Sequence, residues 1–203
     1  MQGSQRALKK NGGDYLKKPM KLTWEGPFGW PGFEKINNLL SLPDACGVYL
    51  ETFPYKNGYI VYGAGHTGRT FKKRLGEWKK DYLDGKCNVL DIDAATRNKK
   101  KIKWEWRGLE ADPIRLSKEK IDLTIDVCKQ LACFRIFIVR IKPKRIRQRV
   151  EASINDYLDT SRYVIHDNVK GMNLVRRKDN EKIRVVKNYT KVRFYGLPKL
   201  LEI

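Results

Sequence analysis

Two tyrosines, an arginine and a glutamate occur in an order that could serve phosphodiester chemistry. Tyr49 and Tyr62 lie in two neighbouring β-prone runs. Arg74 follows in a helical stretch, and Glu151 lies in a later one. An arginine offers a planar fork of donors that matches phosphate oxygens, and a carboxylate can hold Mg²⁺ while water and phosphate fill its other positions. A tyrosine, with an ordinary pKa of about 10, needs nearby cations to lower that pKa before it can act as a base.

The charge balance of the chain points to a polyanionic partner. The 203 residues include 43 Lys and Arg against 23 Asp and Glu, which gives a formal net charge of +20. A small domain stays soluble with a net charge of about 2–8, so the excess favours binding to nucleic acid or to an anionic membrane. The basic residues run along the whole chain with aromatic residues between them, and this pattern favours nucleic acid over a membrane.

The composition predicts one intracellular domain with a core. A hydrophobic content of 41% argues against disorder. No run approaches the roughly 18 apolar residues of a membrane span, and the N-terminal run has no apolar region of a signal peptide. We therefore expect a cytoplasmic protein. The four cysteines lack the paired spacing of a zinc site, which predicts reduced thiols.

Alternating and β-branched runs predict the strands that carry the tyrosines. Residues 47–52 and 58–63 are typical of a β-hairpin with Asn57-Gly58 at its turn, and 134–140 is typical of a central strand. Residues 182–195, KIRVVKNYTKVRFY, predict a basic hairpin. The run 63–68, GAGHTG, has the GxGxxG spacing of a dinucleotide-binding loop. It follows a hairpin strand instead of opening a βαβ unit, which favours a plain glycine turn.

Apolar residues at helical spacing predict three main helices. The first covers 71–82, with the stripe Phe71, Leu75, Trp78 and Tyr82. The second covers 117–133, with the stripe Ile121, Ile125, Cys128 and Ala132. The third begins after Pro143 and carries Glu151 at the edge of its stripe of Ile146, Val150, Ile154, Tyr157 and Leu158. A short helix over 33–42 is also expected.

The ordered set of Gly47-Val48-Tyr49, Val61-Tyr62-Gly63, Arg74 and Glu151 resembles the GIY-YIG nuclease superfamily. The resemblance spans roughly 46–168. In that family the two tripeptides lie on neighbouring strands, an arginine follows in a helix, and a glutamate comes from a later helix. Here the arginine follows Tyr62 by 74 − 62 = 12 residues, slightly more than is usual. Trp78 stands where many members carry a histidine, and Asn168 is taken as the family's late asparagine, with Asn155 as the alternative.

The resemblance implies a fold and an activity. The expected fold is an α+β domain with a small, mainly antiparallel three-stranded sheet flanked by helices. The expected activity is hydrolysis of double-stranded DNA by a Mg²⁺- or Mn²⁺-dependent endonuclease of restriction or mobile-element type. Tyr49 would be the general base, Tyr62 would position water or phosphate, Arg74 would stabilise the phosphorane, and Glu151 would bind the metal.

The expected organisation has three parts. Residues 1–45 form a basic arm and aromatic-rich loops, 46–168 the catalytic domain, and 169–203 a basic, β-rich extension that contacts DNA. Two other functions stay open: a non-catalytic nucleic-acid-binding protein on the same fold, and a nucleotide-cofactor enzyme that uses 63–68. The recognition sequence, the choice of DNA or RNA, the number of strands cut and the oligomeric state, including a dimer, also stay open.

Overall fold

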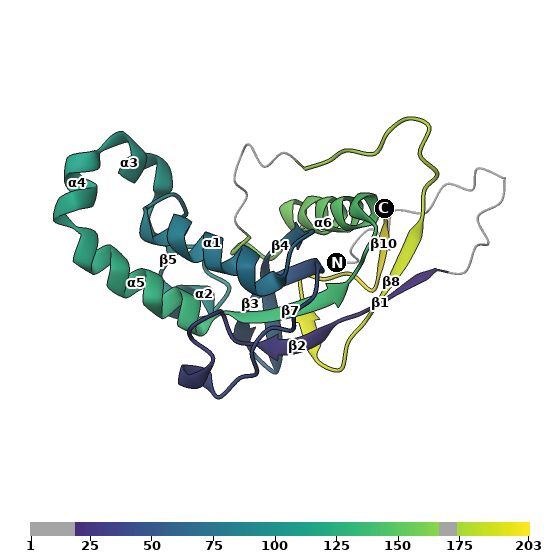
Figure 1. The fold of residues 1–203 in the computed structure, drawn as a ribbon, viewed down its shortest axis with the longest axis horizontal. Coiled ribbons are helices and arrows are strands. Elements are labelled where there is room, and N and C mark those ends of the chain that lie inside the picture. Colours follow the sequence, from purple (N-terminus) through teal and green to yellow (C-terminus); the bar gives the residue numbers. More distant parts are fainter. Residues whose placement is uncertain (1–18, 167–173) are drawn as a thin grey trace, which may run out of the picture.

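A five-stranded sheet forms the centre of the fold (Figure 1). The computed structural model describes residues 19–166 and 174–203. The strand order across the sheet is β2 (Glu25–Phe28), β7 (Arg135–Arg140), β3 (Gly47–Tyr55), β4 (Gly58–Thr67) and β9 (Arg193–Tyr195). All neighbours pair antiparallel except β4 and β9, which are parallel.

The prediction of a small three-stranded sheet flanked by helices is wrong. The three predicted strands are present as β3, β4 and β7, but β2 and β9 extend the sheet at its two edges, and the protein is of mixed α/β type. A second sheet contains β1 (Met20–Thr23), β8 (Val185–Tyr189) and β10 (Leu200–Glu202), and a third contains β5 (Val89–Leu90) and β6 (Ile102–Trp104). Strands this short carry too few residues for a period of two, and β2 contains Gly and Pro, which are rare in strands.

Two local predictions about strands are also wrong. The run 182–195 is not a hairpin, because β8 pairs with β1 and β10 while β9 pairs with β4 in the other sheet. The glycine-rich run 63–67 is not a turn, since it continues β4 in register with β3. Its glycines therefore do not form a phosphate-binding loop of the dinucleotide type.

Helices cover both faces of the central sheet. The face with Tyr49 and Phe53 packs against α1 (Phe71–Leu83) and α5 (Lys120–Cys133), and the face with Val48 and Leu50 packs against α6 (Lys144–Asp159). Short helices complete the fold: η1 (Lys35–Asn37), α2 (Ile92–Ala95), α3 (Trp106–Ala111) and α4 (Pro113–Lys118). Figure 1 shows α3, α4 and α5 as a lobe at the end of the molecule opposite β8 and β10. None of the helices in the described ranges combines the length and apolarity of a membrane span.

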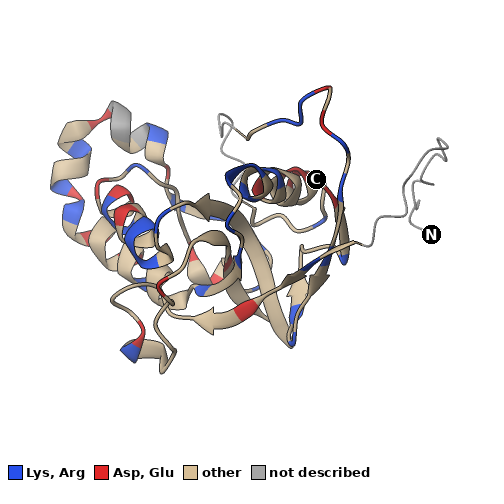
Figure 2. Ribbon diagram, turned by 45° about the vertical axis from the view of Figure 1, so that its right-hand side comes forward, with Lys and Arg blue, Asp and Glu red and all other residues tan. Residues whose placement is uncertain are grey.

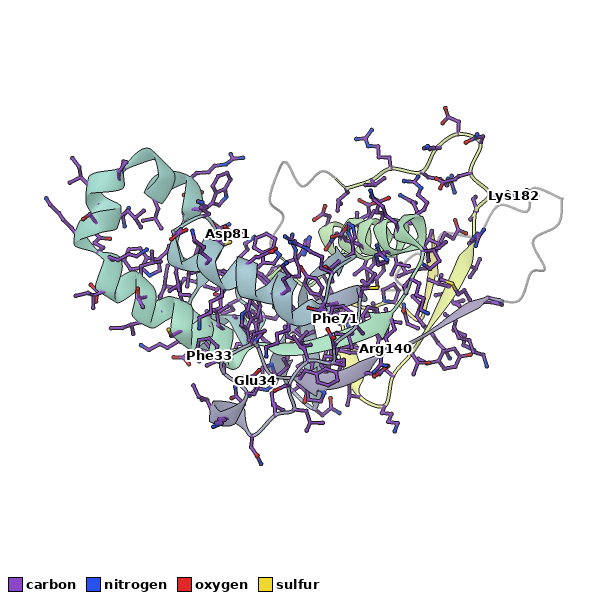
Figure 3. All side chains as sticks on the ribbon, viewed as in Figure 1. Phe33, Glu34, Phe71, Asp81, Arg140 and Lys182 are labelled. Carbon is purple, nitrogen blue, oxygen red and sulfur yellow. The ribbon has the colours of Figure 1, made fainter. Side chains whose placement is uncertain are left out.

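The predicted stripe of α1 is confirmed, whereas that of α5 is wrong. Phe71, which begins α1 at the centre of the molecule (Figure 3), is buried, and Thr70 caps the helix by accepting a hydrogen bond from the Lys73 N–H. The predicted helix over 117–133 is divided between α4 and α5. Ile121 and Ile125 are 76% and 46% exposed. The buried stripe of α5 is instead Leu123, Val127, Gln130 and Leu131. The helix over 33–42 is only the short η1.

Candidate functional site

A β-bulge in the hairpin of β3 and β4 brings the two tyrosines to the same face of the sheet. The pairing shifts between Glu51 and Thr52, so that Tyr62 is an extra residue on β4. Tyr49 and Tyr62 consequently belong to one core cluster. Bulges re-aim side chains in this way.

Tyr49 lies directly across Gly65 of the neighbouring strand. A Cβ atom on Gly65 would come within 2.3 Å of the phenolic oxygen and of Cζ of Tyr49. A Cβ atom on Gly63, two residues earlier in the same strand, would meet nothing within 4 Å. The position of the Tyr49 ring therefore requires glycine at 65, while the space above Gly63 stays open.

Arg74 and Trp78 reach the tyrosines from α1. The Nε1 of Trp78 donates a hydrogen bond to the phenolic oxygen of Tyr49 at 3.1 Å. The guanidinium carbon of Arg74 lies 4.9 Å from the centroid of the Trp78 ring. The Nε of Arg74 is buried without a hydrogen-bond partner among the described residues. Burying a donor without a hydrogen-bond partner costs free energy, unless a bound ligand accepts that hydrogen bond.

The pKa of Tyr49 moves in the direction opposite to the expected one. Burial raises its pKa well above the ordinary value, and the nearby Glu51 carboxylate raises it further. Arg74 and the Trp78 hydrogen bond oppose the rise but do not overcome it. Because removal of the phenol from water penalises the charged form, Tyr49 is a neutral phenol at neutral pH.

Glu151 reaches the site from α6, which lies along the free edge of β4. The parallel strand β9 covers β4 only at Gly58–Ile60. Beyond that point the side-chain amide of Asn155 binds the backbone of Ala64, accepting from its N–H at 3.0 Å and donating to its carbonyl at 2.9 Å. Glu151 lies one helical turn before Asn155 and so faces the same edge. Its Oε2 lies 2.6 Å from Nδ1 of His66 on β4.

One cavity brings the predicted residues together. It has a volume of about 300 Å³, and its lining includes Tyr49, Tyr62, Arg74 and Glu151. Asn155, the alternative for the family's late asparagine, also lines this cavity. Asn168, the preferred candidate, lies outside the described residues.

Three further residues line or contact the site but are not among the site residues predicted from the sequence. Glu51 lines the cavity and shares a strand face with Tyr49, so the period of two in β3 could have indicated it. His66 holds Glu151, but only the unpredicted strand conformation of 63–67 places it there. Trp106 lines the cavity from α3, and no local pattern connects it with the distant hairpin.

Two carboxylates line the cavity and could hold a hard cation that keeps most of its water. In the ranges that the structure describes, no three His, Cys, Asp or Glu side chains form a metal-binding group. Mg²⁺ does not need such a group, because it commonly uses one or two carboxylates and completes its shell with water and phosphate. Glu151 and Glu51 supply two carboxylates, and Oε1 of Glu151 has no hydrogen-bond partner among the described residues.

Comparison with known proteins found no family model, no curated protein and no solved structure that matches this chain. Function is therefore inferred from the sequence motifs and from the geometry of the cavity.

Proposed function

We propose that the protein is a metal-dependent endonuclease of the GIY-YIG type that hydrolyses double-stranded DNA. The main support is the cavity that Tyr49, Tyr62, Arg74 and Glu151 share. These four residues come from three separated parts of the chain, and each has a chemical role at a phosphodiester. The net charge of +20 fits a polyanionic substrate.

Arg74 is the proposed phosphate ligand. Its side chain is one-third exposed, but its Nε is buried without a partner among the described residues. A cation–π contact with the Trp78 ring helps to hold the guanidinium in place. Donors held in this way can stabilise the charge that develops on the phosphorane without being reorganised during the reaction.

Glu151 is the proposed ligand of Mg²⁺ or Mn²⁺, with Glu51 as a second carboxylate of the same cavity. A bound Mg²⁺ would stabilise charge on the phosphate and lower the pKa of a bound water. His66 orients the Glu151 carboxylate through its contact with Oε2. Neighbours of this kind position metal ligands in many sites.

Tyr49 positions the attacking water in this proposal. Its raised pKa means that it is protonated at neutral pH and cannot take up a proton as a phenolate. Its oxygen already accepts a hydrogen bond from Trp78, which holds the phenol in place. Tyr62, on the same face of the sheet, contacts water or phosphate from the neighbouring strand.

Replacing Tyr49 with phenylalanine should lower the cleavage rate by about 10–100-fold, the effect of losing one hydrogen bond to a reacting group. The shape of the pH–rate profile between about pH 6 and 9 should not change, because a raised pKa places loss of the phenolic proton above this window. Initial rates of plasmid nicking across the pH range measure both effects. If the variant loses a limb of the wild-type profile in this window, Tyr49 acts as the base instead.

Replacing Gly65 with alanine should displace the Tyr49 ring, because the new Cβ would lie 2.3 Å from its phenolic oxygen. We expect a loss of about 100-fold in cleavage rate and a loss of about 1–3 kcal/mol in unfolding free energy from overpacking. Gly76→Ala on α1 is the matched control, since its Cβ would also meet nothing within 4 Å and Gly76 does not line the cavity. Urea denaturation and plasmid nicking test both variants. Equal activity of the two variants would show that the position of Tyr49 is unimportant.

Incubation with supercoiled plasmid in Mg²⁺ or in EDTA tests the function as a whole. We expect nicked or linear plasmid only with Mg²⁺. The alternative is a non-catalytic DNA-binding protein. One observation favours it: Trp78 stands where many family members carry a histidine, and its Nε1 donates a hydrogen bond to the Tyr49 phenol. DNA binding without cleavage under either condition would support that alternative and reject the nuclease.

A further inference from the structure

A second cavity lies between α6 and the segment 177–184. It has a volume of about 560 Å³ and contains one acidic side chain, that of Glu181. Five basic side chains line it: Arg145, Arg149, Arg177, Lys182 and Arg184. Figure 2 shows Lys and Arg along this segment, and Figure 3 shows Lys182 well away from Asp81 on α1. The cavity is therefore strongly cationic and lies away from the end of α1 that carries Asp81.

The acidic residue of this cavity is already engaged. The guanidinium of Arg145 donates to both carboxylate oxygens of Glu181. Glu181 also accepts the Lys178 N–H at 2.9 Å. These contacts hold the pKa of Glu181 at about 2, so the carboxylate is charged at neutral pH and forms an ion pair with Arg145. The other four basic residues have no ion pair with a carboxylate among the described residues.

Arg149 has a buried donor that a bound anion could satisfy. Its Nη1 donates to the Val175 carbonyl at 2.6 Å, and its Nε is buried without a partner among the described residues. Arg145 lies one helical turn away, and like charges at this spacing repel. Burial and the charge of Arg145 together lower the pKa of Arg149. A bound anion would relieve both effects.

This cavity is separate from the candidate nuclease site. Arg149 and Glu151 are two positions apart in α6, which places them about 200° apart around the helix axis. No residue lines both cavities in the described parts of the chain. An anion in the second cavity would therefore not be the phosphate that Arg74 contacts.

We propose that this arginine-rich cavity binds a backbone phosphate of duplex DNA away from the cleaved bond. The proposal rests on the proposed function for the identity of the partner. Guanidinium groups match phosphate oxygens in geometry and charge, and contacts to phosphates anchor a duplex without reading its sequence. The cavity would hold the DNA while the first site acts on it.

The test is the salt dependence of DNA binding by the full chain in EDTA, where no cleavage occurs. The triple variant Arg177→Gln, Lys182→Gln and Arg184→Gln changes only exposed residues, so the fold should persist. Fluorescence anisotropy with a short labelled duplex of mixed sequence, between about 50 and 200 mM salt, gives the affinity. We expect affinity to fall about tenfold and the slope of log affinity against log salt to fall by about 0.9, the value of one phosphate contact.

A second triple variant controls for the loss of net charge. Lys35→Gln, Lys118→Gln and Lys129→Gln remove the same charge from exposed positions outside the cavity. This control should retain the wild-type slope. Equal slopes for the two triple variants, or no change in either, would overturn the proposal. The readout is binding, so the two proposals can fail separately. DNA binding that depends on this cavity, without any cleavage, would reject the nuclease function but support the cavity proposal.

Discussion

Replacing Glu151 with glutamine is expected to lower Mg²⁺-dependent DNA cleavage by about 1,000-fold or more. A bound metal ion contributes several kcal/mol of charge stabilisation at a phosphoryl group, and the neutral amide is a much weaker ligand than the carboxylate. Glutamine has nearly the same shape and can still contact His66, so the packing of α6 against β4 should persist. Initial rates of plasmid nicking at saturating Mg²⁺ measure the effect.

A metal-binding measurement separates this effect from simple inactivation. Isothermal titration with Mn²⁺ in the absence of DNA should detect binding to the wild type and little binding to Glu151→Gln. Glu119→Gln is the matched control, because Glu119 pairs with Arg115 in the helical lobe and does not line the cavity. Wild-type Mn²⁺ affinity in Glu151→Gln would assign the metal to other residues.

Elements with a strong local signal could be predicted from the sequence. The hairpin of β3 and β4 has β-prone runs around an Asn-Gly turn, β7 is a continuous apolar and β-branched run, and α1 has a clear helical stripe. The helix α5 has two apolar stripes, and packing against α1, not periodicity, selects Leu123 and Val127 for the core. The edge strands β2 and β9 depend on partners far along the chain, and no local pattern reports such pairing.

The candidate site shows the same division between local and distant information. Residue types and their order were sufficient to select Tyr49, Tyr62, Arg74 and Glu151, because the chemical group that each side chain offers can be read directly from the sequence. Their convergence depends on features without a sequence signal. The bulge brings Tyr62 to the same face of the sheet as Tyr49, and the side-chain amide of Asn155 joins α6 to the open edge of β4.

Replacing Arg74 with lysine should lower the cleavage rate by about 100–1,000-fold, the usual effect of removing one positioned donor from a developing oxyanion. Lysine keeps the charge but loses the planar fork and the contact of the guanidinium with the Trp78 ring. The net charge stays at +20, so DNA affinity in EDTA should remain close to that of the wild type. The loss should therefore appear in the rate at saturating DNA and not in binding.

Arg69→Lys is the matched control for this substitution. Arg69 precedes α1, is half exposed and binds the Glu77 carboxylate through both of its terminal nitrogens. It does not line the cavity, so its replacement should leave the cleavage rate within about twofold of the wild type, as expected for an exposed ion pair. If Arg74→Lys also retained wild-type activity, a point charge would be sufficient at this position. The buried, unpartnered Nε would then have no part in holding the phosphate.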